Sequence, residues 1–359
     1  MSEETAPTKT ISDFEAKLDQ ADKSVASFAA DDRSPILIIR KYLRSHPTAI
    51  PTMVLILSLI FFGIIAPNFM RVSTLSLVLQ QVTVTGIVAI AQTAIVLTAG
   101  IDLSVGAILV LSSIVMGKLA VGSGVPAVFA ILIGIGAAGL MGWLNGLLVT
   151  VVRLPPFIVT LGTLNVFNAL KLWYSQSESI RADDIVAKAP LLDFFGQELH
   201  IFGATFTYGG IGLILLALFS WYLLNRTPWG RHVHAVGDDP DAALLSGIQV
   251  NRVLTSVYVF AGVICGLGAW VAIGRIGSVS PIGFETVNLD SITATVIGGT
   301  SLFGGRGSIA GSVLGALIVG TFNTGLALAG VDDYWQIFAT GVLTIVAVAI
   351  DQWLRRASQ

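Results

Sequence analysis

The 359-residue chain is poor in charge, with 12% charged residues against the roughly 25% of an ordinary soluble domain. It also has only one cysteine and four histidines, whereas 54% of its residues are hydrophobic. A chain this apolar cannot expose an ordinary polar surface to water over most of its length. The composition therefore predicts an all-α polytopic membrane protein rather than a soluble globular one.

The same scarcity excludes several kinds of function. The single cysteine, Cys265, forms no intrachain disulfide and no Cys-x-x-Cys metal site. A net charge of −2 gives no basic footprint for nucleic acid. The GxxxxGK[ST] phosphate loop, the GxSxG turn of hydrolases and the HExxH zinc motif are all missing. We therefore expect no enzymatic activity, no metal site and no cofactor on this chain.

Charge-free stretches recur along the chain, and a transmembrane helix needs about 20 apolar residues. Six stretches are long enough: 45–70, 72–101, 119–152, 200–225, 253–274 and 307–331. Four shorter ones are 103–117, 154–170, 291–305 and 334–350, and some of the resulting elements are expected to be half-length, broken or re-entrant. Together they predict about ten transmembrane or partly re-entrant helices within a membrane domain at 46–356.

Positive charge predicts the orientation, because cytoplasmic loops retain an excess of Lys and Arg. With the N-terminus inside, ten crossings leave the larger share of the basic loop residues inside as well. Both termini are therefore expected in the cytoplasm. Of the two long polar loops, 174–205 is expected outside and 226–252 inside. Residues 1–45 form a polar tail in which apolar residues from Ile11 to Phe28 recur every three or four positions, which predicts a short amphipathic helix.

The inner loop contains DDPDAALLSG, which has the signals of a complete short helix. Asp238 or Asp239 can cap its start, Pro240 suits the first helical position, and Gly247 can end it. Two turns of helix are marginal alone in water, so the segment needs something to pack on. It either lies against its own bundle or docks on a cytoplasmic partner, and we favour docking.

GIDLSVG, from Gly100 to Gly106, places one carboxylate between two apolar runs. Gly100 can end the incoming helix, and Asp102 can cap the outgoing one by accepting bonds from amides near Ser104 or Val105. A carboxylate there also meets the positive end of the helix dipole. We expect Asp102 to be a structural cap at the inner edge of the bundle, rather than an ion-coupling or catalytic group.

Ionisable side chains are missing from the centres of the expected spans, which argues against a proton- or sodium-coupled carrier. Uncharged amides and hydroxyls suit passage of a neutral polyol such as a sugar, although a single amide more often bonds one helix to another. The candidates for lining such a path are Gln81, Gln92, Asn145, Asn165, Asn168 and Asn323. The Gly- and Ser-rich segment 290–305 is expected to form a short or re-entrant helix beside it.

Four motifs together resemble the permease subunits of carbohydrate-uptake ABC transporters, the ribose, xylose, arabinose and galactose class. They are GIDLSVG, LPPFIVTLGTLN (154–165), GRHVHAVGDDPDAALLSGI (230–248) and VIGGTSLFGGRGSIAG (296–311). The likeness covers about 51–356, nearly the whole chain. FEAKLDQADKSVASF in the tail and LWYSQSESIRADDI in the outer loop look most like permeases of bacterial fructose importers.

The resemblance implies a homodimer of permease chains, multi-pass in the lipid of the bacterial inner membrane. It implies a separate ATPase subunit that binds ATP on the cytoplasmic side and a periplasmic sugar-binding protein outside. The coupling segment to the ATPase would include Gly237, Asp239, Pro240, Asp241, Ala242, Ala243, Leu244 and Gly247. The family motif would include Gly100, Asp102, Ser104 and Gly106.

The function implied is import of a monosaccharide, with fructose favoured over ribose and other pentoses or hexoses. Other importer classes begin the coupling motif with Glu-Ala-Ala, and this chain has Asp241-Ala242-Ala243 in its place. Two alternatives remain open. One is an ABC permease for another small solute, such as a branched-chain amino acid or a nucleoside, and the other is a stand-alone secondary transporter.

Overall fold

The structure is a computed structural model, and it describes residues 48–201 and 203–356. From residue 50 on, the described part of the chain forms one compact unit. The amphipathic helix expected between Ile11 and Phe28 lies outside the described residues and stays a prediction.

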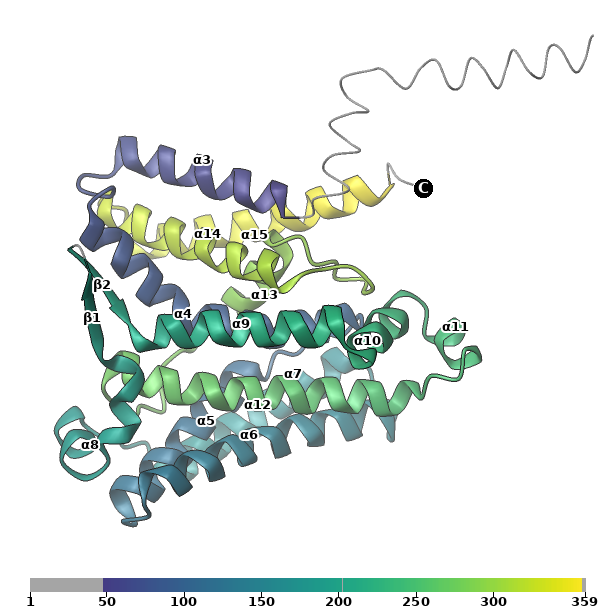
Figure 1. Cartoon of the computed structure of the whole chain (residues 1–359), viewed down its shortest axis with the longest axis horizontal. Coiled ribbons are helices and arrows are strands. Elements are labelled where there is room, and N and C mark those ends of the chain that lie inside the picture. Colours follow the sequence, from purple (N-terminus) through teal and green to yellow (C-terminus); the bar gives the residue numbers. More distant parts are fainter. Residues whose placement is uncertain (1–47, 202, 357–359) are drawn as a thin grey trace, which may run out of the picture. The chain divides into compact units, whose positions relative to one another are not determined.

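Nearly all of the described chain is helical (Figure 1). The longer helices are α3 (Ala49–Ile65), α4 (Val72–Leu97), α5 (Val105–Gly117), α6 (Ala127–Thr150), α7 (Pro156–Ser175), α9 (Tyr208–Arg226), α10 (Pro228–Asp238), α12 (Val250–Ile276), α13 (Val287–Ile297), α14 (Ile309–Leu328) and α15 (Asp333–Arg356). The short elements are α8 (Ala182–Lys188), a 3-10 helix (Pro190–Gly196), strands β1 (Glu198–Ile201) and β2 (Ala204–Thr207), and α11 (Pro240–Leu245). The two strands form an antiparallel hairpin that pairs Glu198 with Thr207.

Six of the described helical segments are long and apolar enough to cross a membrane, and α5 counts among them together with the π-helical turn Lys118–Gly122 that continues it. The others are α4, α6, α9, α12 and α14, while α3 and α13 are apolar but shorter. An all-α membrane protein is therefore confirmed. The count of about ten membrane helices and the cytoplasmic position of both termini stay predictions.

Three boundaries differ from those expected. The stretch 119–152 is not one helix, because Lys118–Gly122 extends α5 and the extended backbone of Pro126 precedes α6. The start of the expected span 200–225 is instead the β-hairpin, and α9 begins only at Tyr208. The inner loop contains α10 before α11, a helix that was not predicted from the sequence. Charge-free gaps show where charge is absent, and they do not show where a helix starts.

The core of the unit lies along α4 and α12. From Val82 to Leu97 nearly every residue of α4 is buried, and Val257, Ala261 and Cys265 of α12 are buried as well. By contrast, α9 turns large apolar side chains such as Leu215 outward. Without a hydrophobic driving force between helices in lipid, association depends on close packing. This arrangement is the one expected in a bilayer: the centre of the bundle is tightly packed, and α9 at its outside turns apolar side chains outward.

The polar connections gather at two opposite ends of the bundle, as Figure 1 shows. The end that carries α8 and the β-hairpin is called the α8 end, and the end that carries α10 and α11 is called the α11 end. This separation agrees with the expectation that the loops 174–205 and 226–252 lie on opposite sides of a membrane.

Candidate functional site: a docking helix, a buried aspartate and a polar pocket

The helix α11 forms as its sequence predicts. The Asp239 carboxylate accepts hydrogen bonds from the backbone N–H groups of Asp241 at 2.9 Å and Ala242 at 3.0 Å. Pro240 occupies the first helical position, where its missing N–H costs nothing. Gly247 follows the helix with φ +84°, the left-handed conformation that favours glycine.

The six residues of α11 divide into a buried and an exposed side. Ala243 is 4% exposed and belongs to the main core, so this side packs on the bundle. Leu244 is 61% exposed and Leu245 is 90% exposed. Single exposed leucines are common on proteins, but two adjacent ones at the tip of a capped loop helix form a small apolar knob. The side of α11 that carries Ala243 thus packs on its own bundle, which was one of the two alternatives expected. The other side carries the knob formed by Leu244 and Leu245, which is exposed and accessible to a partner.

Asp102 lies two residues before Ser104, the N-cap residue of α5, and is 1% exposed. Its Oδ1 accepts hydrogen bonds from the Ser104 N–H at 2.7 Å and from the Ser104 hydroxyl at 2.6 Å. The Asn145 amide on α6 donates to Asp102 Oδ2 at 3.3 Å and to Ser104 Oγ at 2.8 Å. The expected contact with the Ser104 amide is present. Asp102 is buried inside the packed protein, and its expected place at the inner edge of the bundle stays a prediction.

Other helices hold the backbone around Asp102. With its amide oxygen and nitrogen assigned from the hydrogen-bond network, Gln92 of α4 pairs with both the C=O and the N–H of Asp102, at 3.1 and 3.3 Å. Thr160 of α7 donates to Ile101 O at 3.0 Å. Asn288 of α13 donates to Leu103 O at 3.2 Å. The break between α4 and α5 is therefore a fixed joint at which five helices meet, since α6, α7 and α13 bond to it as well.

The joint carries no compensating cation. Among residues 48–201 and 203–356, no Lys, Arg or His forms an ion pair with Asp102. Two buried polar atoms, Asn145 Oδ1 and Tyr258 Oη, make no hydrogen bond within the described part of the chain. Burying a carboxylate costs free energy, which neutral donors offset here: the Ser104 N–H and hydroxyl, the Val105 N–H and the Asn145 amide.

A polar pocket of about 280 Å³ lies between α4, α12, α13 and α14. Among the residues lining it are Gln81, Thr85, Arg275, Phe284, Thr286, Asp290 and Asn323. Its volume is near the lower end of the roughly 300–1,000 Å³ usual for small-molecule sites. Amide, guanidinium, carboxylate and hydroxyl groups beside an aromatic ring provide both donors and acceptors, which suits a small polar solute.

Neighbouring side chains orient the polar groups of the pocket. Thr286 Oγ1 donates to Asp290 Oδ2 at 3.0 Å, and the Arg275 guanidinium lies 5.8 Å from the centroid of the Phe284 ring. The carbonyl oxygen of the Gln81 side chain accepts from the Thr324 hydroxyl at 2.9 Å. The amide nitrogen of Gln81 is therefore the part of that side chain left for a solute.

The six candidate amides separate into three groups. Gln81 and Asn323 line the pocket, whereas Gln92 and Asn145 belong to the Asp102 joint. The remaining two are on α7 and meet neither group; Asn165 is exposed and bonds to its own helix, to Leu161 O at 3.0 Å.

Arg275 and Asp290 of the pocket were missed as site residues. Arg275 is the basic residue in the last turn of α12. Asp290 was noted only as part of a Gly- and Ser-rich segment. A carboxylate in the first turn of a short apolar helix is the signal that could have identified it.

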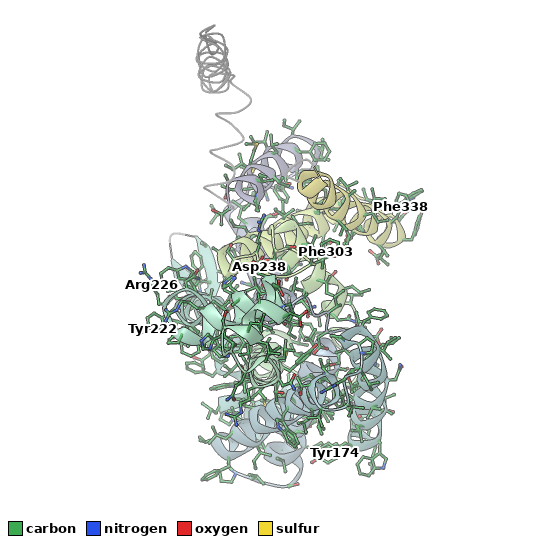
Figure 2. The ribbon with its side chains drawn as sticks, turned by 90° about the vertical axis from the view of Figure 1, so that its right-hand side faces the viewer. Tyr174, Tyr222, Arg226, Asp238, Phe303 and Phe338 are labelled. Carbon is green, nitrogen blue, oxygen red and sulfur yellow. The ribbon has the colours of Figure 1, made fainter. Side chains whose placement is uncertain are left out.

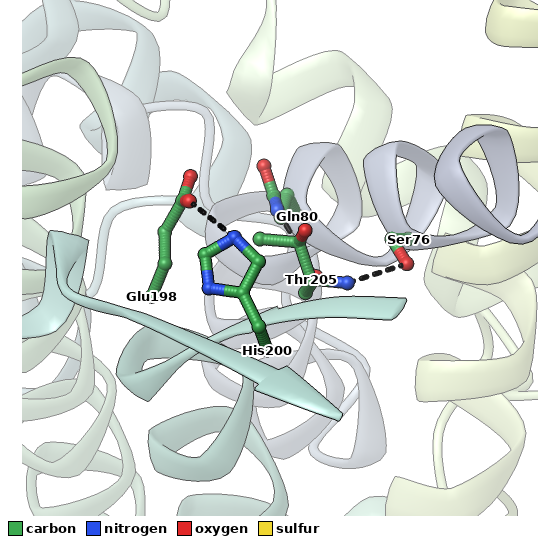
Figure 3. A network of polar contacts seen from close by, with 5 residues as sticks. All are labelled: Ser76, Gln80, Glu198, His200 and Thr205. Carbon is green, nitrogen blue, oxygen red and sulfur yellow. Dashed lines mark hydrogen bonds and ion pairs between the residues drawn. The ribbon is translucent and has the colours of Figure 1, made fainter. Parts of the chain in front are cut away.

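The β-hairpin is fastened to the helix that carries Gln81 (Figure 3). Gln80 Nε2 donates to Thr205 O at 3.1 Å, and the Thr205 N–H donates to Ser76 Oγ at 3.1 Å. Beside them His200 Nε2 lies 3.5 Å from Glu198 Oε2, on the exposed side of the hairpin. A force on the hairpin therefore acts directly on α4, one residue from the pocket.

Comparison with known proteins gives one family and a set of related permeases. A model of the family described as "Branched-chain amino acid transport system / permease component" matches residues 74–347. The fructose import permease protein of Rhizobium meliloti is 50% identical over all 359 residues, which is 100% of both chains. The ribose import permease protein of Bacillus subtilis is 39% identical over 84% of this chain and 92% of its own.

A third relative, the D-allose transport system permease protein of Escherichia coli K12, is 35% identical over 82% of this chain and 88% of its own. No solved structure matches the chain. The matched region, 74–347, contains the Asp102 joint, the docking helix α11 and the whole polar pocket. The chain belongs to the family described as the permease component of the branched-chain amino acid transport system.

Proposed function

We propose that the chain is the membrane-spanning permease subunit of an ATP-driven ABC importer that carries a monosaccharide, with fructose favoured. Support for fructose comes from the relative that is 50% identical over the full length, and the next relatives are named for ribose and D-allose. The assembly would contain two permease chains, a separate ATPase subunit that binds ATP, and a periplasmic sugar-binding protein.

The observation that carries the proposal is the knob formed by Leu244 and Leu245. The chain has no phosphate-binding loop of its own, so energy from ATP must reach it through another protein. The knob is an exposed apolar surface on a rigid capped helix. It fits the ATPase as a partner because it lies at the end that positive charge assigns to the cytoplasm.

The proposed cycle follows from the two ends of the bundle. The sugar-binding protein docks at the α8 end, which is expected outside, and the hairpin transmits this contact to α4 through Gln80. The ATPase pulls on α11 at the other end. The bundle then switches the polar pocket between outward and inward access, as a rigid-body change between packed states. No covalent chemistry takes place on this chain.

The test is ATP-driven uptake in proteoliposomes that contain the permease, its ATPase and its binding protein. We expect labelled fructose to accumulate faster than ribose, D-allose and galactose. Leucine belongs in the panel, because Arg275 and Asp290 in the pocket offer both charges that a zwitterion needs. Faster uptake of leucine than of any sugar would refute the proposed substrate class.

A separate pair of variants tests whether the ATPase docks on the knob. Leu245→Arg places a charge on the knob, so we expect loss of ATPase co-purification and of uptake. Gln249→Arg adds the same charge at another exposed position of the loop and should retain both. Ala243→Arg is a poor test, since Ala243 is buried against the bundle and the variant would damage packing. Normal uptake by Leu245→Arg would contradict docking through this knob.

A further inference from the structure

Three segments far apart in the sequence meet at the α11 end without side chains between them. Gly237, near the end of α10, is buried so closely that a Cβ there would overlap the carbonyl oxygen of Leu97, the last residue of α4. The same Cβ would lie 2.8 Å from the backbone nitrogen of Gly305, in the turn between α13 and α14. Only glycine fits at this position.

Hydrogen bonds and backbone conformation complete this meeting point. The Gly305 N–H donates to Leu97 O at 2.9 Å, and a ring nitrogen of His234 on α10 lies 3.1 Å from Gly305 O. Gly304 has φ +87°, and a Cβ there would overlap the carbonyl oxygen of Gly237. We call these five residues the three-way contact. Figure 2, which looks onto this end, labels Asp238 of α10 and Phe303 of the turn close together.

The three-way contact joins the docking helix to the walls of the polar pocket. Asp239 alone separates α10 from α11, and its N–H still bonds to Ala235 O of α10 at 3.1 Å, so the two helices are directly linked. The other partners of the contact are the end of α4 and the α13–α14 turn. Those same elements line the pocket farther along, with Gln81 on α4, Asp290 on α13 and Asn323 on α14.

We propose that the three-way contact is where a displacement of α11 is transferred to the pocket walls, and that Gly237 is a positioning residue for transport. This inference rests on the proposed function. Direct backbone contact transmits a displacement with little loss, because close-packed interiors resist compression. A flexible side chain in the same place would absorb part of the movement. The contact thus moves α4 and the α13–α14 turn together when α10 moves.

The test is the number of sugar molecules imported per ATP hydrolysed by the assembled importer. A residue with only a structural role changes uptake and ATP hydrolysis in proportion, so this ratio stays constant. For Gly237→Ala we expect the ratio to fall about tenfold, as overpacking separates the three segments. Gly136→Ala is the matched control, since a Cβ on Gly136 of α6 meets nothing within 4 Å, and its ratio should equal that of the wild type.

A second pair covers the case in which Gly237→Ala fails to assemble. His234→Ala removes the side-chain contact with Gly305 O but leaves the backbone in place, and we expect the ratio to fall about threefold, the value of one modest hydrogen bond. His232→Ala, an exposed histidine of the same helix, should not change it. An unchanged ratio in His234→Ala and in any Gly237→Ala complex that assembles overturns the inference. Absence of ATP-driven uptake in the wild type instead overturns the proposed function.

Discussion

Substitutions of Asp102 distinguish a structural role of its side chain, as a hydrogen-bond acceptor at the start of α5, from a role of its negative charge in transport. Asp102→Ala leaves the Ser104 N–H and the Ser104 hydroxyl without their acceptor in a buried place. Each buried donor left unsatisfied costs about 1–3 kcal/mol, so the two together cost about 2–6 kcal/mol. Asn145 keeps one partner, because it still donates to Ser104 Oγ.

Asp102→Asn keeps one carbonyl oxygen for Ser104 and removes a buried charge that no described cation pairs with. The side-chain NH2 group that the substitution introduces would face the NH2 group of Asn145, so that two donors would point at each other. Rotation of Asn145 resolves the conflict, since Asn145 Oδ1 has no partner in the described part of the chain. The rotation gives up the bond to Ser104 Oγ, so we expect a net cost of about 1 kcal/mol.

The assay is the thermal unfolding midpoint of the purified permease in detergent, together with sugar uptake by the importer. At roughly 2 °C per kcal/mol for a chain of this size, we expect Asp102→Ala to unfold about 4–12 °C below the wild type. Asp102→Asn should unfold within about 2 °C and retain much of its uptake. A stable, normally inserted Asp102→Asn protein without uptake would refute the cap and show that transport needs the charge.

Two further pairs test packing and the pocket. Gly142→Ala should lower the unfolding midpoint in detergent, because the added methyl group would overlap the Tyr258 carbonyl oxygen. Gly136→Ala on the same helix faces open space and should raise the midpoint, because alanine has the higher helix propensity. The reverse order of the two midpoints would contradict the α6–α12 packing. Gln81→Leu should raise the KM for sugar uptake, while Asn165→Leu, exposed on α7, should leave it unchanged; equal effects would contradict the pocket as the sugar path.

Local signals explain which parts of the site were predictable. The cap of α11 by Asp239, the proline after it and the ending glycine act within a few residues, so the sequence predicts them without knowledge of the fold. The same holds for the bond between Asp102 and the Ser104 amide. Where the signal is only an absence of charge, as at 119–152 and 200–207, the helix boundaries were wrong.

The sequence by itself therefore determined the membrane class, the short capped helix α11 and the bond between Asp102 and the Ser104 amide before α5, since composition and short-range hydrogen bonds decide these. Only the tertiary structure decided that Asn145 and Gln92 serve the Asp102 joint, that Arg275 and Asp290 share a pocket with Gln81, and that Gly237 touches Leu97. These contacts join residues that are from 10 to about 210 positions apart in the sequence and lie on different elements. Helix packing fixes them, and no spacing along the chain encodes which faces meet.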